Sequence, residues 1–69
     1  MRLESADQLG GLIRQRREAL KLRQGELASI SGVDQGNLSK IERGCARARF
    51  ETYLRLCSAL GIDLMAEAR

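Results

Sequence analysis

The chain has 69 residues, of which 43% are hydrophobic and 30% charged, a composition typical of a folded globular domain rather than of a disordered segment. A chain this short buries only about 60% of the surface that its unfolded form exposes, so its core is thin and a partner subunit would add to it. The net charge of +3 gives a modest attraction to polyanions. No apolar run approaches a transmembrane helix and the N-terminus lacks a signal-peptide core, so we expect a cytoplasmic protein.

The residue types narrow the function further. Phe50 and Tyr53 are the only aromatic residues, which disfavours a surface that stacks unpaired bases and favours duplex DNA over single strands. Cys45 and Cys57 stand without any histidine, so side chains alone cannot complete a four-ligand zinc site, and neither thiol has a histidine base. We therefore expect free thiols, no metal, no cofactor and no enzymatic activity.

Helical periodicity runs through most of the chain, which contains no proline. A first helix is expected over residues 6–20, where five inward positions recur at spacings of three and four: Leu9, Leu12, Ile13, Arg16 and Leu20. A second is expected over residues 24–31, with Leu27, Ala28 and Ile30 pointing inward and Gly32 as its left-handed end.

Asp34 is a favourable N-cap, so a third helix is expected over residues 35–43, with Leu38 and Ile41 inward and Gly44 closing it. A basic loop follows, and then a fourth helix that ends at Gly61 and has an apolar face of Phe50, Tyr53, Leu54, Cys57 and Leu60. Residues 62–69 suit a short strand and a last helical turn equally well.

Two short helices joined by a tight turn at Gly32 have helix-turn-helix geometry. In order along the chain, the sequence also resembles the Xre/Cro family of prokaryotic and phage repressors, over about residues 9–62. The matching elements are Gln24, Glu26-Leu27-Ala28, Gly32-Val33, Leu38-Ser39-Lys40-Ile41-Glu42-Arg43-Gly44 and Ala59-Leu60-Gly61-Ile62. The resemblance implies an all-α, lambda-repressor-like bundle of four to five short helices, as a single domain over 1–69 with the helix-turn-helix at 24–44.

The second helix of such a motif lies in the major groove and the first crosses the phosphate backbone. The residues expected at bases are Gln35, Gly36, Asn37 and Lys40; a glutamine can bond adenine N6 and N7, and a lysine can reach guanine or a phosphate. The residues expected at phosphates are Arg23, Gln24, Ser39, Arg43, Arg47 and Arg49. By the resemblance, Gln24 also braces Gln35. The alternative for the loop arginines is a role in solubility alone.

The resemblance further implies a partly buried ion pair between Arg17 and Glu42, tying the first helix to the end of the third. Arg23 departs from the family pattern, since it stands where a Thr or Ser usually caps the second helix, so we expect that helix to start frayed or Arg23 to bind a phosphate instead. Gly25 and Gly36 lie inside the two motif helices and weaken them. Gly36 implies either narrower base readout or a close approach of the backbone to DNA.

One reading helix offers few base contacts, so the family binds pseudo-palindromic operators as homodimers. If residues 62–68 form a strand, Ile62, Leu64 and Ala66 are expected at an intersubunit sheet, an ending like that of HipB-type antitoxins, which bind a HipA-like toxin kinase and repress their own operon. An all-helical ending favours instead a phage-type repressor or a restriction-modification controller protein. The rival from another class is an interaction adaptor that no longer binds DNA.

Overall fold

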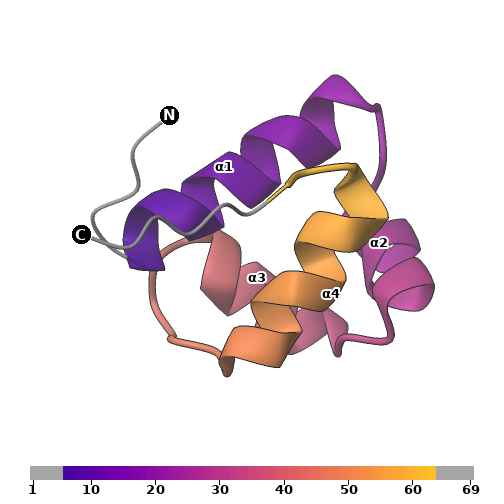
Figure 1. The fold of residues 1–69 in the computed structure, drawn as a ribbon. Coiled ribbons are helices and arrows are strands. Elements are labelled where there is room, and N and C mark those ends of the chain that lie inside the picture. The colour runs from indigo at the N-terminus through magenta and orange to yellow at the C-terminus, as the bar shows by residue number, and fades with distance from the viewer. Residues whose placement is uncertain (1–5, 64–69) are drawn as a thin grey trace.

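The computed structural model describes residues 6–63 and contains four helices within that range: α1 (Ala6–Ala19), α2 (Gln24–Ser31), α3 (Gln35–Glu42) and α4 (Phe50–Leu60). α1 packs against α3 and α4, and α2 packs against the same two helices, so α3 and α4 are held between the other pair (Figure 1). The all-α prediction is confirmed for the described residues, and each predicted helix is present within one residue of its expected ends. The choice between a strand and a helical turn, which the sequence left open for residues 62–69, falls mostly on residues outside the described range.

The helix ends follow from local chemistry. Gly32, Gly44 and Gly61 lie at the predicted helix ends and all have positive φ, and the residue after each donates its backbone N–H to a carbonyl five residues earlier. This is the Schellman arrangement, in which glycine avoids the steric cost of the left-handed conformation. α1 ends in the same way, but its left-handed residue is Lys21, with φ of 59°.

The core draws on every helix and on the turn between α2 and α3. Its most deeply buried side chains include Ile13, Leu27, Leu38, Ile41 and Leu56, and Val33 closes it at the turn. Leu27, Leu38 and Ile41 were predicted to point inward, and the structure confirms them. The core fixes α3 from beneath, so that its opposite side faces solvent.

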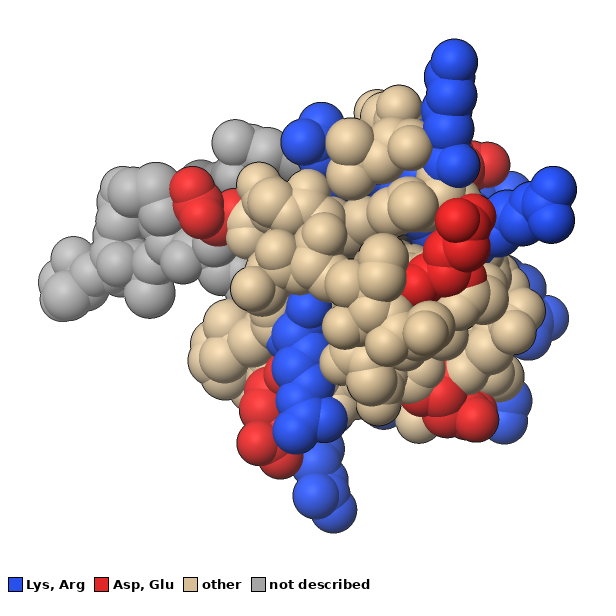
Figure 2. Space-filling model, turned by 90° about the vertical axis from the view of Figure 1, so that its right-hand side faces the viewer, with Lys and Arg blue, Asp and Glu red and all other residues tan. Residues whose placement is uncertain are grey.

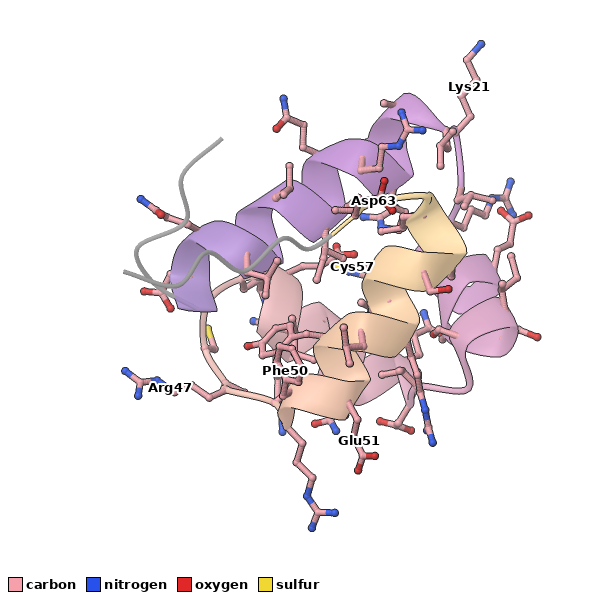
Figure 3. The ribbon with its side chains drawn as sticks, viewed as in Figure 1. Lys21, Arg47, Phe50, Glu51, Cys57 and Asp63 are labelled. Atoms are coloured by element: carbon pink, nitrogen blue, oxygen red, sulfur yellow. The ribbon has the colours of Figure 1, made fainter. Side chains whose placement is uncertain are left out.

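Four apolar residues that the periodicity placed on buried faces are exposed: Leu20, Ile30, Phe50 and Leu54. Ile30 is 63% exposed, because Leu27 and Ala28 set the buried face of α2 and Ser31, not Ile30, completes it. Phe50 is 70% exposed, because the buried stripe of α4 begins one turn later, at Tyr53, and continues through Leu56, Cys57 and Leu60. Figure 3 shows Phe50 at the start of α4. The spacing of apolar residues was correct, but the phase of the stripe was not.

α1 and α3 approach each other backbone to backbone at Gly10. A methyl group added to Gly10 would collide with the carbonyl oxygen of Ile41, whereas one added to the neighbouring Gly11 would meet nothing within 4 Å. Gly10 is buried and Gly11 is exposed. The signal for this contact in the sequence is the pair of glycines inside a helix, where each is unfavourable unless packing requires it, and no role was predicted for Gly10.

Candidate nucleic-acid interface

The first turn of α3 is built by Asp34, whose Oδ2 accepts from the backbone N–H of Asn37 at 3.0 Å. This confirms Asp34 as the N-cap and fixes where α3 begins. The four residues expected at bases are all exposed: Gln35, Gly36, Asn37 and Lys40. The outer side of α3 therefore carries two side-chain amides, one ammonium group and, at Gly36, backbone without a side chain. Amides and ammonium groups form hydrogen bonds with base edges and phosphates.

The other end of α3 is anchored from inside the protein by Glu42, which is 5% exposed. Arg17 of α1 donates to both of its oxygens, from Nε to Oε2 at 2.8 Å and from Nη2 to Oε1 at 2.9 Å. The Nη1 group of Arg17 also donates to the carbonyl oxygen of Leu22 at 2.7 Å. The hydrogen bond with Glu42 raises the pKa of Arg17, against an opposing effect of burial, so the guanidinium stays charged.

Gln24 takes part in the same cluster. Its Nε2 donates to Oε1 of Glu42 at 3.1 Å, so Glu42 accepts three hydrogen bonds from two other helices. The resemblance implied that Gln24 braces Gln35, whereas in this structure the amide of Gln24 is directed to the end of α3. The neighbour of Gln35 is instead Gly25, where an added methyl group would lie 3.3 Å from Oε1 of Gln35. The start of α2 thus meets both ends of α3.

Arg23 precedes α2 as its N-cap residue and is exposed. An arginine side chain has no acceptor, so it cannot cap the helix. The cap is completed in the other direction, because Oε1 of Glu26 accepts from the backbone N–H of Arg23 at 2.9 Å. This is the glutamate half of a capping box, and it holds the start of α2, for which the sequence predicted either fraying or a phosphate contact by Arg23.

The remaining residues expected at phosphates lie at the end of α3 and in the loop that follows it. Arg43 is exposed, and its Nε donates to the carbonyl oxygen of the half-buried Ser39 at 3.3 Å. Arg47 and Arg49 are exposed residues of the loop, and Arg47 points away from the bundle (Figure 3). The loop is fixed from below, since the buried Tyr53 accepts at its hydroxyl from the backbone N–H of Ala48 at 3.3 Å.

The surface charge is mixed. On the face drawn in Figure 2, Lys and Arg side chains project around the rim and Asp and Glu side chains stand among them. This fits the net charge of +3 and means that charge alone does not mark the interface. The arrangement of α2 and α3 is a better indicator of the candidate interface than the surface charge.

The residues expected at a dimer interface are only partly covered by the structure. Ile62 is half-buried, packs against the core of its own chain, and donates its backbone N–H to the carbonyl oxygen of Cys57 at 2.8 Å. Leu64 and Ala66 lie outside the described residues.

A family model described as a helix-turn-helix domain matches residues 8–69. The chain belongs to this family. Helix-turn-helix proteins among the solved structures show the same fold. The restriction-modification controller protein C.AhdI from Aeromonas hydrophila is 33% identical, with a TM-score of 0.78 over 84% of this chain and 88% of that one.

Two structures of HipB also match this helix-turn-helix domain. The first, a HipA-HipB-O2-O3 complex, gives a TM-score of 0.86 at 20% identity and covers 99% of this chain and 96% of that one. The second, a HipB variant in complex with an O2 20mer, gives 0.84 at 21% identity and covers 100% and 97%. At these identities the likeness concerns the fold alone. The chain therefore has the fold of helix-turn-helix DNA-binding regulators.

A search of the curated proteins gives no match. Within residues 6–63, none of the helices has the length and apolar character needed to cross a membrane.

Proposed function

We propose that this protein binds double-stranded DNA through α3 and acts as a transcriptional repressor. The observation that carries the proposal is the asymmetry of α3: Leu38 and Ile41 are buried, Glu42 is fixed by Arg17 and Gln24, and the outer side of the helix is left to polar side chains. A recognition helix needs this combination, since its side chains must reach base edges from a rigid support.

The individual roles follow from position and chemistry. Gln35, Asn37 and Lys40 contact bases, and the bare Gly36 lets the backbone of α3 come close to the groove. Arg23 and Gln24 lie at the start of α2, whose N-terminus faces the phosphate backbone in this type of docking. Ser39, Arg43, Arg47 and Arg49 supply further phosphate contacts. For Gln24 to reach a phosphate, its bond to Glu42 has to be shared or exchanged.

The direct test is a gel-retardation assay with random-sequence duplex DNA at low salt. Binding to phosphates releases counterions, so we expect retardation that weakens steeply as the salt concentration rises. Absence of retardation at every salt concentration contradicts DNA binding and supports the interaction-adaptor alternative.

We further propose that the protein works as a homodimer on a pseudo-palindromic operator. One eight-residue reading helix offers few base contacts, and two copies related by a two-fold axis double them. Analytical ultracentrifugation of the protein with and without a duplex obtained by selection tests this. Two copies per duplex are expected, and one copy per duplex at saturation contradicts the homodimer.

Among repressors, we propose a HipB-like antitoxin that represses its own operon and binds a HipA-like toxin. The support is the similarity of fold, which for the HipB structures extends over almost the whole chain, while the match to C.AhdI covers 84% of it. Co-expression with the product of the adjacent gene and purification through a tag on this chain distinguishes the two. A stable complex supports the antitoxin, and its absence favours a restriction-modification controller or a phage-type repressor.

A further inference from the structure

Gly25, in the first turn of α2, lies beside the side chain that begins α3. A methyl group built on Gly25 would lie 3.3 Å from Oε1, 3.8 Å from Cδ and 4.0 Å from Nε2 of Gln35. All three atoms belong to the terminal amide. The amide of Gln35 therefore lies against bare helix backbone, at a position where any other residue would present a side chain.

The backbone gives no reason for a glycine at this position. Gly25 is exposed, it lies within a helix, and it is not among the residues with positive φ. Glycine loses the most backbone freedom on folding, so it is unfavourable in a helix unless another feature requires it. The contact with Gln35 is the one feature at Gly25 that a side chain would alter.

Gln24, the residue before it, does not hold Gln35 in this structure, since its amide donates to Glu42. A Cβ at residue 25 would crowd the amide of Gln35 in its present orientation, because a separation of 3.3 Å from Oε1 is tighter than ordinary van der Waals contact. A glutamine reads adenine with both of its terminal atoms, so the direction of the amide decides whether it meets N6 and N7 together.

We propose that Gly25 is a positioning residue for base readout: the absence of a side chain leaves room for the orientation in which the amide of Gln35 meets the DNA, an orientation that a larger residue would disturb. The inference rests on the proposed DNA-binding function and adds to it a specificity determinant outside the reading helix. Gly25 acts through Gln35 and not by contacting a base itself.

The test compares Gly25→Ala with Gly11→Ala, a matched control in which a helical, exposed glycine has nothing within 4 Å of the added methyl group. Each variant and the wild type selects from a library of random duplexes, and relative affinities for the selected duplexes are then measured by fluorescence anisotropy. Both variants are expected to melt at a higher temperature than the wild type, because alanine is the better helix former.

Only Gly25→Ala is expected to change base preference, by about tenfold at the base pair whose preference is also lost in Gln35→Ala. In a Gln35→Ala background, Gly25→Ala is expected to change nothing further. If Gly25→Ala selects the same sequence with the same affinity as Gly11→Ala, the inference is wrong. It is also wrong if the change persists without Gln35, because the methyl group then meets the DNA directly.

A second measurement needs no DNA. In the free protein, an NMR contact is expected between the side-chain amide of Gln35 and the α-hydrogens of Gly25, and its absence overturns the inference by itself. If the wild type selects no duplex at all, the proposed DNA binding fails. If the wild type selects a duplex and Gly25→Ala selects the same one, the inference about Gly25 fails alone.

Discussion

Arg17 and Glu42 form a two-pronged ion pair between α1 and the last residue of α3, with N–O distances of 2.8 and 2.9 Å. Both side chains are buried, and the remaining donor group of Arg17 is satisfied by the carbonyl oxygen of Leu22. The pair sets the position of α3 relative to α1, and it explains why a charged residue stands at the inner side of α3.

Removing one partner of this pair leaves a poorly solvated charge. We expect Arg17→Ala to lower the free energy of unfolding by about 3 to 5 kcal/mol, a large part of the stability of so small a domain. Urea denaturation followed by circular dichroism measures it. A melting temperature equal to that of the wild type would contradict the role given to the pair.

The cost comes from the stranded charge and not from the loss of attraction alone. The double variant Arg17→Met with Glu42→Leu strands no charge, so it is expected to be more stable than Arg17→Ala. If the double variant is instead the less stable of the two, the pair contributes net attraction beyond the cost of its burial.

Gly10 and Gly11 make a matched pair on α1. Gly10→Ala places a methyl group against the carbonyl oxygen of Ile41 and forces α1 away from α3, which is expected to cost about 1 to 3 kcal/mol or more. Gly11→Ala meets nothing and is expected to gain on the order of 1 kcal/mol from helix propensity. Thermal melts of the two variants should therefore shift in opposite directions. Equal shifts would contradict the close approach of the two backbones.

Lys21 holds the left-handed position at the end of α1 that glycine holds at the ends of the other described helices. A non-glycine residue pays about 1 to 2 kcal/mol for this conformation, so Lys21→Gly is expected to stabilise the protein, offset in part by the greater freedom of glycine in the unfolded chain. Its side chain points away from the bundle (Figure 3), so no packing is lost. A lower melting temperature for Lys21→Gly would show that the side chain contributes more than its backbone costs.

The two thiols are expected to differ in reactivity. Burial raises the pKa of Cys57, which lies inside the bundle (Figure 3), while Cys45 is exposed in the loop after α3. At pH 8 a thiol reagent should therefore modify Cys45 rapidly and Cys57 only as fast as the protein unfolds. Equal rates for both would contradict the burial of Cys57.

The same shift has a consequence for stability. Because the folded-state pKa lies above the ordinary value of 9.0, the contribution of the neutral thiol is fully present below pH 9.0 and is lost as the pH rises through the folded-state pKa. Cys57→Ala is expected to lose less stability than the wild type over that alkaline range. If the stabilities of the wild type and of Cys57→Ala fall in parallel as the pH rises, the raised pKa of Cys57 is contradicted.

Much of the fold could be predicted because its signals are local. Asp34 bonds a backbone N–H three residues away, and Gly32 and Gly61 end helices through their own conformation, so each is readable from a few neighbouring residues. The spacing of apolar residues predicted where the helices lie, but it did not always predict which face of a helix is buried. In the eight residues of α2 the inward positions fit more than one phase, and Ile30 was placed on the wrong side.

The rest depended on contacts between distant parts of the chain. The bond of Gln24 to Glu42 spans 18 residues, and the approach of Gly10 to Ile41 spans a larger separation. The sequence marks residues with long-range contacts only as unexplained departures from helix propensity. Gly10 and Gly25 are examples, since each weakens its helix and no neighbouring residue explains it. Their explanation requires knowing which helix lies opposite.

The central claim is that α3 reads DNA, and it is tested most directly by two variants that each remove one positive charge. Lys40→Ala changes the outer side of α3, and Arg14→Ala changes an exposed arginine of α1 whose Nε lies 3.5 Å from Oε1 of Glu18. Affinities for the duplex selected by the wild type are measured by fluorescence anisotropy at one salt concentration. Lys40→Ala is expected to weaken binding by about tenfold or more, and Arg14→Ala by about twofold at most. Equal losses in the two variants would contradict recognition by α3.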